Sequence, residues 1–375
     1  MTHPRAQRLI ALALGAAPVA FSFAPDAQGI VRRDDVADQV YIDAALAPEY
    51  DAVGRIFTNA GQCTATLITP DTILTAAHCF GAAGSNATAS TFEIQTAEGL
   101  QVVDVSNSTV LRHPGWTGSF ETGVDIAIIQ LDTPITSVEP ALLDFGIRSN
   151  SLTQDVTAVG YGRAGTGSTG SQPGTEGTKR AGENRIDVLT TLTGGTRSYL
   201  QADFDTPGAG PFNQALDTEF SAASGDSGGP IFLTNVFDQE RIVGVSSFIS
   251  AADGVADGDY GDTSGWTPVA DGYDWLFPLI AGEADGVFFG DANFSGSVEL
   301  IDFDILSSNF DSVGATWSTG DFNGDGVVNL VDFDLLSQNF GNSFFPVGVL
   351  ATPEPGTLAG LALAGGLLAR RRRLA

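Results

Sequence analysis

The sequence is poor in cysteine, in methionine and in positive charge. It has two cysteines and one methionine in 375 residues. Two cysteines exclude a disulfide-dense scaffold and a four-cysteine zinc site, and they permit one intramolecular bridge. Lysine and arginine number 17 against 45 acidic residues, which gives a net charge of −28. A nucleic-acid-binding protein needs a basic face, and the basic residues here are scattered or terminal, so we expect no nucleic-acid partner.

Long helical patterns are also missing from residues 30–285. Short β-branched runs recur there instead, separated by Gly, Pro, Asn and Asp. Examples are Ala65–Thr69, Thr72–Thr75, Asp125–Gln130 and Arg241–Val245. Such runs are typical of an all-β sandwich or barrel.

The N-terminus has the three-part layout of a secretory signal peptide. A basic start precedes an apolar run from Leu9 to Phe23, and the small-residue stretch Ala27–Gly29 follows. The alternative is a buried N-terminal helix, which the prolines in this region disfavour. We therefore expect residues 1–29 to be removed by signal peptidase and the protein to be exported.

The C-terminus combines Pro353-Glu354-Pro355, an apolar stretch Gly356–Ala369 and the cluster Arg370–Arg373. As a helix the apolar stretch would cover about 21 Å, less than the roughly 30 Å hydrocarbon core. The arrangement resembles the PEP-CTERM signal of Gram-negative bacteria. The resemblance implies that residues 343–375 are a linker and sorting tail, associated transiently with the membrane and removed by an exosortase-like enzyme. It also implies a location at the cell surface, in the extracellular matrix or in the medium, for a Gram-negative-type bacterium.

A twelve-residue pattern occurs twice, in Asp291–Asp302 and again in Asp321–Asp332. Side-chain oxygens fall at positions 1, 3, 5, 9 and 12, glycine is at position 6, and position 7 offers its carbonyl, as in calcium-binding loops. The predicted ligands are Asp291, Asn293, Ser295, Ser297, Glu299, Asp302, Asp321, Asn323, Asp325, Val327, Asn329 and Asp332. A single cluster of this kind is usually a solvated turn, whereas two copies in register favour Ca2+.

Apolar residues at helical spacing follow each loop and predict two helices that bury one shared face. These residues are Phe303, Leu306 and Phe310 in the first copy and Phe333, Leu336 and Phe340 in the second. The repeats resemble a type I dockerin. The resemblance implies a small α-helical module over residues 286–342, two Ca2+ ions and a cohesin-like partner, although Leu300-Ile301 and Leu330-Val331 stand where the family often has a polar pair.

Three further segments contain residues suited to catalysis. They are Leu74–Cys79, which contains His78, Gly123–Ala127, which contains Asp125, and Gly225–Pro230, which contains Ser227. Their order and wide spacing resemble the trypsin-like (chymotrypsin-fold) serine proteases over about two-thirds of the chain. The resemblance implies two six-stranded antiparallel β-barrels in residues 30–285, and protein or peptide substrates.

Each residue type suits its expected role. A serine hydroxyl is a weak nucleophile, so Ser227 needs a base, and His78 can take its proton near neutral pH. Asp125 would fix the His78 tautomer and stabilise the imidazolium. The backbone N–H groups of Gly225 and Ser227 would form the oxyanion hole, where one donor is worth about 3–4 kcal/mol of transition-state stabilisation.

The resemblance also implies a disulfide between Cys63 and Cys79 that pins the histidine loop. Closing a loop of about 15 residues is worth about 3 kcal/mol in the chain-entropy model. The alternative is two buried free thiols. Ala223 stands where the family often has a cysteine of a second bridge, beside the serine loop.

Removal of residues 1–29 would leave Ile30 as the N-terminus. In the family, such an amine inserts beside the acid that precedes the serine, here Asp226. We therefore predict that export activates the enzyme, although Arg32 and Arg33 replace the usual glycines.

The substrate pocket is predicted from position in the family. Ser221 stands at its floor, where no carboxylate supports a preference for Arg or Lys, and Ser247, Phe248 and Ile249 form the substrate-binding strand. Ile249 in place of a glycine suggests a shallow pocket for small or medium apolar side chains; a plain core strand is the alternative. For the whole protein, the alternative to a peptidase is a catalytically inactive adhesion or matrix protein of the cell surface, because a fold alone does not establish activity.

Overall fold

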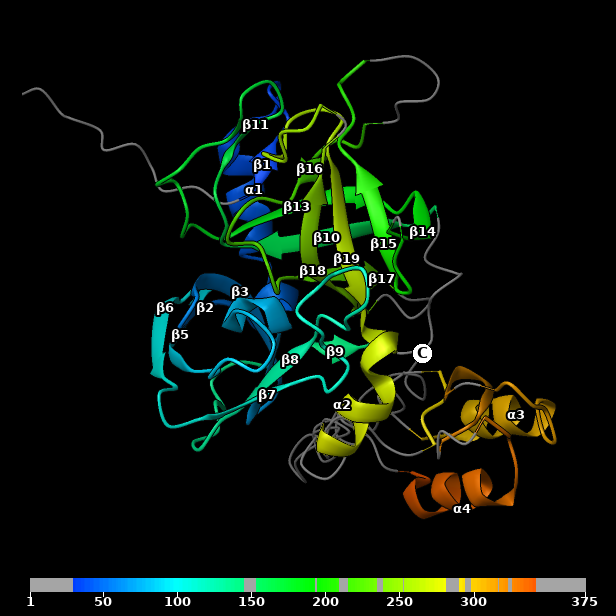
Figure 1. The fold of residues 1–375 in the computed structure, drawn as a ribbon. Helices are drawn as coiled ribbons and strands as arrows, with labels where there is room; N and C mark the ends of the chain where they lie inside the picture. Colours follow the sequence, from blue (N-terminus) through cyan, green and yellow to red (C-terminus); the bar gives the residue numbers. More distant parts are fainter. Residues whose placement is uncertain are drawn as a thin grey trace, which may run out of the picture.

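The computed structural model in Figure 1 describes ten stretches of the chain. They are residues 30–144, 153–192, 194–208, 215–234, 239–251, 253–280, 290–293, 298–315, 317–322 and 326–341. The predicted signal peptide and sorting tail lie outside these residues. So do the predicted calcium ligands Ser295, Ser297, Asn323 and Asp325.

The first half of the described chain forms a seven-stranded antiparallel sheet, drawn in blue and cyan in Figure 1. Its order is β6-β5-β2-β3-β4-β8-β7. The strands are β2 (Val53–Thr58), β3 (Gly61–Thr69), β4 (Thr72–Thr75), β5 (Ala89–Thr96), β6 (Gly99–Asp104), β7 (Thr109–Arg112) and β8 (Ala127–Gln130). Their β-branched and aromatic residues form a dry interior because alternate side chains point to one face. Leu67, Ile73, Phe92 and Ile128 are all fully buried there.

The second half forms an eight-stranded sheet, drawn in green and yellow in Figure 1. Its main path is β13-β10-β17-β18-β19-β15-β14, and β9 pairs with β18 in parallel. The strands are β9 (Leu142–Leu143), β10 (Asp155–Gly160), β13 (Arg180–Arg185), β14 (Val188–Thr191), β15 (Ser198–Asp203), β17 (Pro230–Thr234), β18 (Glu240–Ser250) and β19 (Thr263–Pro268). Leu200, Phe220, Ile231 and Trp266 pack in its core.

The N-terminal segment is built into the second half by hydrogen bonds and charge. Strand β1 (Val31–Arg32) lies between β11 (Gly165–Thr166) and β16 (Phe220–Ser221), and β12 (Gly170–Ser171) completes this four-stranded sheet. Helix α1 (Asp38–Ala45) follows, with Asp38 in a two-pronged ion pair to the fully buried Arg180. A buried charge needs such a partner, so the pair holds the segment in place.

The prediction of a mostly β fold with few helices is confirmed. The strand pairing differs from two closed six-stranded barrels, because the hydrogen-bonded ladders of the two large sheets run as open paths of seven strands each. In the second sheet, β14 lies at the end of the path, and β9 pairs with β18 outside it.

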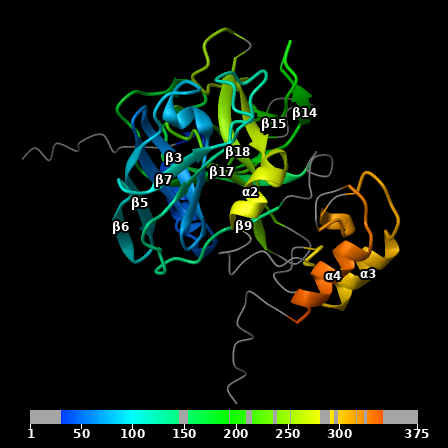
Figure 2. The ribbon, with the colours of Figure 1, turned by 60° about the horizontal axis from the view of Figure 1, so that its bottom comes forward.

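Three α-helices follow the sheets in the described chain: α2 (Tyr273–Ile280), α3 (Leu300–Ser308) and α4 (Leu330–Asn339). None of the helices in the described stretches is both long and apolar enough to cross a bilayer. Helices α3 and α4 lie side by side in Figure 2, with the Phe303 and Phe333 rings 6.1 Å apart.

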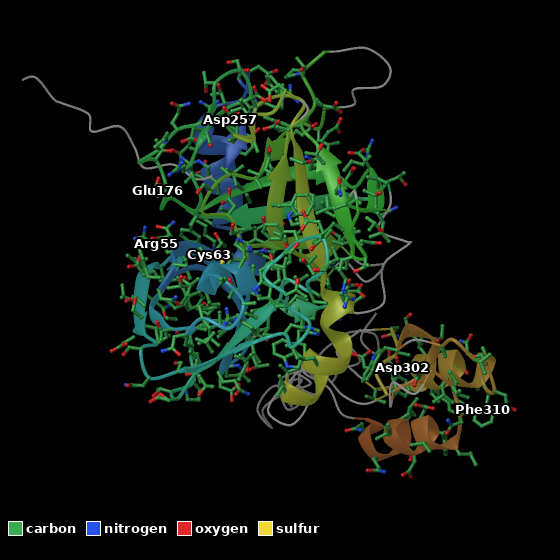
Figure 3. The ribbon with its side chains drawn as sticks, in the orientation of Figure 1. Arg55, Cys63, Glu176, Asp257, Asp302 and Phe310 are labelled. Carbon is green, nitrogen blue, oxygen red and sulfur yellow. A yellow bond between two sulfur atoms is a disulfide. The ribbon has the colours of Figure 1, made fainter. Side chains whose placement is uncertain are left out.

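The prediction of one buried face on α3 and α4 is only partly right. Leu306 and Leu336 are buried, whereas the four phenylalanines that were expected with them are 38–50% exposed. Trp317 and Phe322 fill the interior instead, with their rings 5.0 Å apart. In Figure 3, Phe310 accordingly lies at the outer edge of the module.

Candidate active site

His78 and Asp125 form a tightly held pair in the first half. His78 lies in a 3-10 helix, Ala77–Phe80, directly after β4, and Asp125 lies just before β8. His78 Nδ1 is 2.7 Å from Asp125 Oδ2, and the His78 backbone N–H donates to Oδ1 at 2.8 Å. Asp125 is fully buried, so its carboxylate depends on these donors. The pair places the Nδ1 proton towards Asp125 and leaves Nε2 to act as a base.

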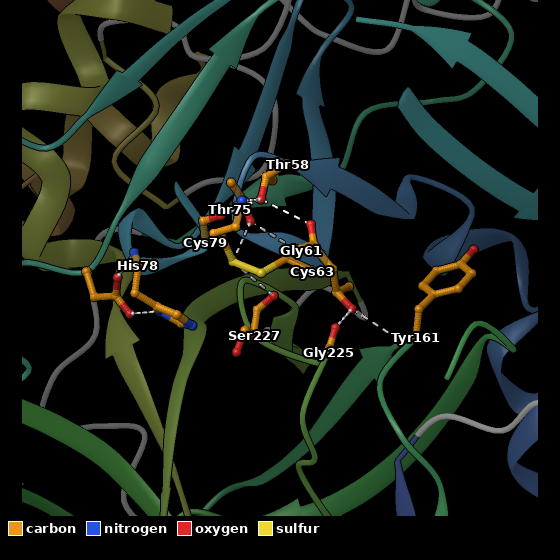
Figure 4. Close-up of a disulfide and its surroundings, with 12 residues drawn as sticks. Thr58, Gly61, Cys63, Thr75, His78, Cys79, Tyr161, Gly225 and Ser227 are labelled. Atoms are coloured by element: carbon orange, nitrogen blue, oxygen red, sulfur yellow. Dashed lines mark hydrogen bonds and ion pairs between the residues drawn. A yellow bond between two sulfur atoms is a disulfide. The ribbon is translucent and has the colours of Figure 1, made fainter. Parts of the chain in front are cut away.

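Ser227 comes from the second half, in the turn between β16 and β17. Figure 4 shows its side chain and that of His78 facing each other. Within the described residues, no hydrogen bond joins Ser227 Oγ to His78. Catalytic hydrogen bonds of this kind are often long until substrate binds. The structure therefore brings the three predicted triad residues together and directly bonds two of them.

The turn before Ser227 leaves two backbone donors unused. Gly225 has φ +103°, a conformation that favours glycine. The turn is closed by bonds from Asp226 N–H to the Ala223 carbonyl and from Gly229 N–H to the Asp226 carbonyl. In the described part of the chain, the N–H groups of Gly225 and Ser227 donate to no other group. They are thus available to a developing oxyanion.

The Asp226 side chain anchors this turn to neighbouring segments. Its carboxylate is buried and accepts the N–H groups of Gly162 at 2.7 Å and Ala223 at 2.8 Å, together with that of Ile30. Burial raises the pKa of Asp226 to about 7, against the opposing effect of these bonds and of the Arg180 charge. The backbone N–H of Ile30 thus lies beside Asp226 in the full-length chain, and insertion of a freed Ile30 amine stays a prediction.

Two glycines make room for the Asp226 carboxyl group. A Cβ atom on Gly160 would lie 2.0 Å from Asp226 Oδ1, and one on Gly162 would lie 2.5 Å from its Cγ. Neither contact is sterically allowed. The Gly160-Tyr161-Gly162 motif thus serves the acid beside the nucleophile, a role that the sequence alone did not reveal.

Cys63 and Cys79 are joined, with their Cα atoms 6.2 Å apart, and the alternative of two free thiols is wrong. The bridge connects β3 to the 3-10 helix that carries His78 (Figure 4). It therefore fixes the base against the strand that packs behind the serine turn.

A cavity of about 310 Å³ opens beside Ser227. Phe248 and Ile249 line it as expected, together with residues 222–224 before the nucleophile. It is also lined by Arg163, Ser171, Ser246, Ala256 and Asp257. The sequence did not mark Arg163 and Asp257 as site residues, because they belong to loops without a recognisable pattern. Asp257 is labelled in Figure 3.

Ser221 and Ser247 do not line this cavity. Ser221 is fully buried, with its hydroxyl 3.3 Å from that of Ser264. Ser247 is 3% exposed and its hydroxyl lies 2.7 Å from that of Thr267. The prediction that these two serines contact the substrate is therefore wrong for this cavity. Each is buried beneath the residues that line it, and its hydroxyl pairs with a neighbouring hydroxyl.

An aromatic wall runs from His78 to the cavity. The Phe120 ring meets the His78 ring edge-on, with centroids 5.4 Å apart, and lies 5.8 Å from the Phe248 ring. Phe248 also packs on Tyr199 and directly over Gly265, where a Cβ would lie 2.3 Å from its ring. Phe120 lies in a loop before Asp125, and no periodic pattern marked it.

The two loops predicted to bind calcium are described in part. Asp291 and Asp321 at position 1 and Asp302 and Asp332 at position 12 are all at most 4% exposed. The Asp302 and Asp332 carboxylates accept backbone N–H groups at 2.7–3.1 Å from both ends of their loops. Gly326 N–H donates to Asp321 Oδ2 at 2.8 Å. Glu299 and Asn329 at position 9 are the N-caps of α3 and α4.

Comparison with known protein families gives a match over the part of the chain that contains the candidate site. The family model described as Trypsin matches residues 48–276, more than half of the chain. The matched range contains His78, Asp125 and Ser227 and ends before α3.

Proposed function

The chain belongs to the trypsin family, and from that premise we propose that it is an exported serine endopeptidase that uses His78, Asp125 and Ser227. The observation that carries the proposal is the meeting of His78, bonded to the fully buried Asp125, with a serine whose turn keeps two N–H groups free. We take the two sheets to correspond to the two barrels of the chymotrypsin-like fold.

The geometry supports the following steps. Ser227 Oγ attacks the scissile carbonyl carbon while His78 Nε2 takes its proton, and Asp125 stabilises the imidazolium. The N–H groups of Gly225 and Ser227 hold the oxyanion of the tetrahedral intermediate. When the C–N bond breaks, His78 returns the proton to the leaving amine. Water then hydrolyses the acyl-enzyme with His78 again acting as the base.

The alternative, an inactive adhesion or matrix protein, has no observation in its favour. An inactive relative need not keep all three side chains, the pair of free N–H groups and the buried Asp226. All of these are present here.

A fluorophosphonate probe should label the wild-type protein at Ser227. The Ser227→Ala variant should not be labelled, and its kcat should fall by about 10⁶-fold, the loss seen when the nucleophile of a triad is removed. Ser250→Ala at the exposed end of β18 is the matched control and should keep wild-type labelling. Failure of the folded wild type to react would support the inactive alternative.

We further propose that the cavity beside Ser227 accepts small or medium apolar side chains. Ile249 and Phe248 contribute apolar surface and limit its depth. Arg163 and Asp257 bring one charge of each sign, so the charge of the wall favours neither acidic nor basic side chains.

Cleavage of a peptide library should show hydrolysis mainly after residues such as Ala, Val and Leu. Ile249→Gly should shift the preference towards larger aromatic side chains because it removes the bulk that narrows the cavity. Dominant cleavage after Lys or Arg by the wild type would refute the proposed pocket.

Activation by signal-peptide removal is the next part of the proposal. Ile30 is 1% exposed and has φ +63°, which is strained for a β-branched residue by about 1–3 kcal/mol. The φ angle of Ile30 is defined by the bond to the preceding peptide, so cleavage before Ile30 would release this strain. The new amine would carry a positive charge next to Asp226. Arg32 does not prevent this arrangement, since its guanidinium lies 3.5 Å from Asp38.

N-terminal sequencing of the secreted protein should begin at Ile30. In the uncleaved chain the raised pKa of Asp226 makes the free energy of unfolding fall as the pH rises from about 4 to about 7. The Ile30 amine should lessen that fall, because its charge favours the ionised carboxylate. Activity of the processed enzyme should then decline above about pH 8, where an ordinary α-amine loses its proton. A secreted protein that begins at a different residue would contradict activation by signal-peptide removal.

We propose that each repeat binds one Ca2+. Four buried carboxylates at equivalent loop positions support this, because a hard cation prefers oxygen ligands. Burial raises the pKa of Asp302, and a bound cation would offset that penalty. The cohesin-like partner and the location at the cell surface or in the matrix stay predictions.

Calcium should raise the melting temperature of the full chain, and a chelator should reverse the effect. Asp302→Ala combined with Asp332→Ala should abolish calcium binding in a calorimetric titration. Asp304→Ala combined with Asp334→Ala, on the same helices but outside the loops, is the matched control. Equal calcium affinity in both double variants would contradict the assignment.

A further inference from the structure

Thr64 connects the segments that build the oxyanion turn. It is the residue after Cys63 in β3 and is fully buried. Its hydroxyl donates to the Gly225 carbonyl at 2.9 Å and accepts the Tyr161 N–H at 3.0 Å. Its backbone N–H donates to the Ser227 carbonyl at 2.9 Å. Figure 4 shows Gly225, Tyr161 and Ser227 gathered around Cys63 at this point.

The two carbonyls that Thr64 binds lie on either side of the oxyanion donor. The Gly225 carbonyl belongs to the peptide before Asp226, and the Ser227 carbonyl belongs to the peptide after the nucleophile. A peptide is planar, so holding its oxygen also fixes the direction of its N–H. The peptide that carries the Ser227 N–H lies between these two anchored planes. Its own carbonyl, that of Asp226, accepts the Gly229 N–H at 2.8 Å. Thr64 therefore fixes the two flanking peptides and, together with Gly229, sets the direction of the Ser227 N–H.

The Thr64 hydroxyl also links the turn to the segment that holds Asp226. The Tyr161 N–H that it accepts comes from the Gly160-Tyr161-Gly162 motif, against which the Asp226 carboxylate packs. The Thr64 carbonyl in turn accepts the Thr75 hydroxyl at 2.9 Å, at the end of the strand that leads to His78. One side chain and its backbone thus join three segments of the site.

We propose that the Thr64 hydroxyl is a positioning residue for the oxyanion hole. It acts through the Gly225 carbonyl and touches no substrate. In this role it offsets the missing second disulfide at Ala223. The inference rests on the proposed peptidase function, since an oxyanion hole has a purpose only in such a reaction.

Thr64→Val is the central test because valine keeps the shape and removes only the hydroxyl. The Thr64 methyl packs close to Gly229, where a Cβ would lie 3.1 Å from it, and valine preserves that contact. We expect kcat on a peptide substrate to fall about 10- to 100-fold, somewhat less than when a direct oxyanion donor is removed. KM should change less than about threefold. Thr64→Ser restores the hydroxyl and should recover most of kcat.

Thr66→Val is the matched control for Thr64→Val. Thr66 lies on the same strand, two residues on, and is 1% exposed, and its hydroxyl has no hydrogen-bond partner among the described residues. It should keep wild-type kcat. Wild-type kcat in a folded Thr64→Val variant would overturn the inference, as would an equal loss in Thr66→Val or no recovery in Thr64→Ser.

A second readout separates this inference from the proposed function. Amide hydrogen exchange at Asp226 and Gly229, whose N–H groups close the turn by donating to the Ala223 and Asp226 carbonyls, reports the turn whether or not the protein is a peptidase. It is measured by NMR in the full chain. Faster exchange in Thr64→Val than in Thr66→Val supports the positioning role, and equal exchange overturns it. An inactive wild type would overturn the proposed function alone.

Discussion

Much of the catalytic geometry depends on one buried carboxylate. Asp226 is buried, with 4% of its surface exposed, so it must collect hydrogen-bond donors from the protein. It takes them from Ile30, from Gly162 and from Ala223, three points far apart in the sequence. Satisfying this single group draws the N-terminal segment, the Gly160-Tyr161-Gly162 motif and the nucleophile turn together. Because Asp226 directly precedes Ser227, its anchoring also sets where the nucleophile lies.

The site lies where the two halves of the protein meet. In the proposed peptidase, the first half supplies His78 and Asp125, held by the Cys63–Cys79 bridge, and the second supplies Ser227 and the cavity beside it. Neither half contains a complete site. The position of one half relative to the other must therefore be fixed to within about 0.5 Å. Direct links from β3 to the serine turn, above all those of Thr64, fix that position without a second disulfide.

Sequence motifs predicted the parts of this site that chemistry restricts to one residue type. His78, Asp125 and Ser227 stand in short segments whose order alone pointed to their roles, and the two cysteines allowed one bridge. Ser221 and Ser247 were predicted to line the pocket from their positions relative to the family, but both are buried and pair with neighbouring hydroxyls instead. Phe120, Arg163 and Asp257 could not be found, because loops bring them to the site through tertiary contacts. The exposed Phe310 and Phe340 show the same limit of the sequence. Helical spacing predicts that two helices share an apolar face, but it does not predict which side chains occupy the interior.

The central claim is that the N–H groups of Gly225 and Ser227 form an oxyanion hole beside a reactive Ser227. A crystal structure of the wild-type enzyme treated with a peptide aldehyde tests it most directly. The account predicts a bond from Ser227 Oγ to the aldehyde carbon, with the hemiacetal oxygen about 2.7–3.1 Å from both nitrogens. An adduct whose oxygen points away from these two nitrogens, or a folded enzyme that forms no adduct, would contradict it.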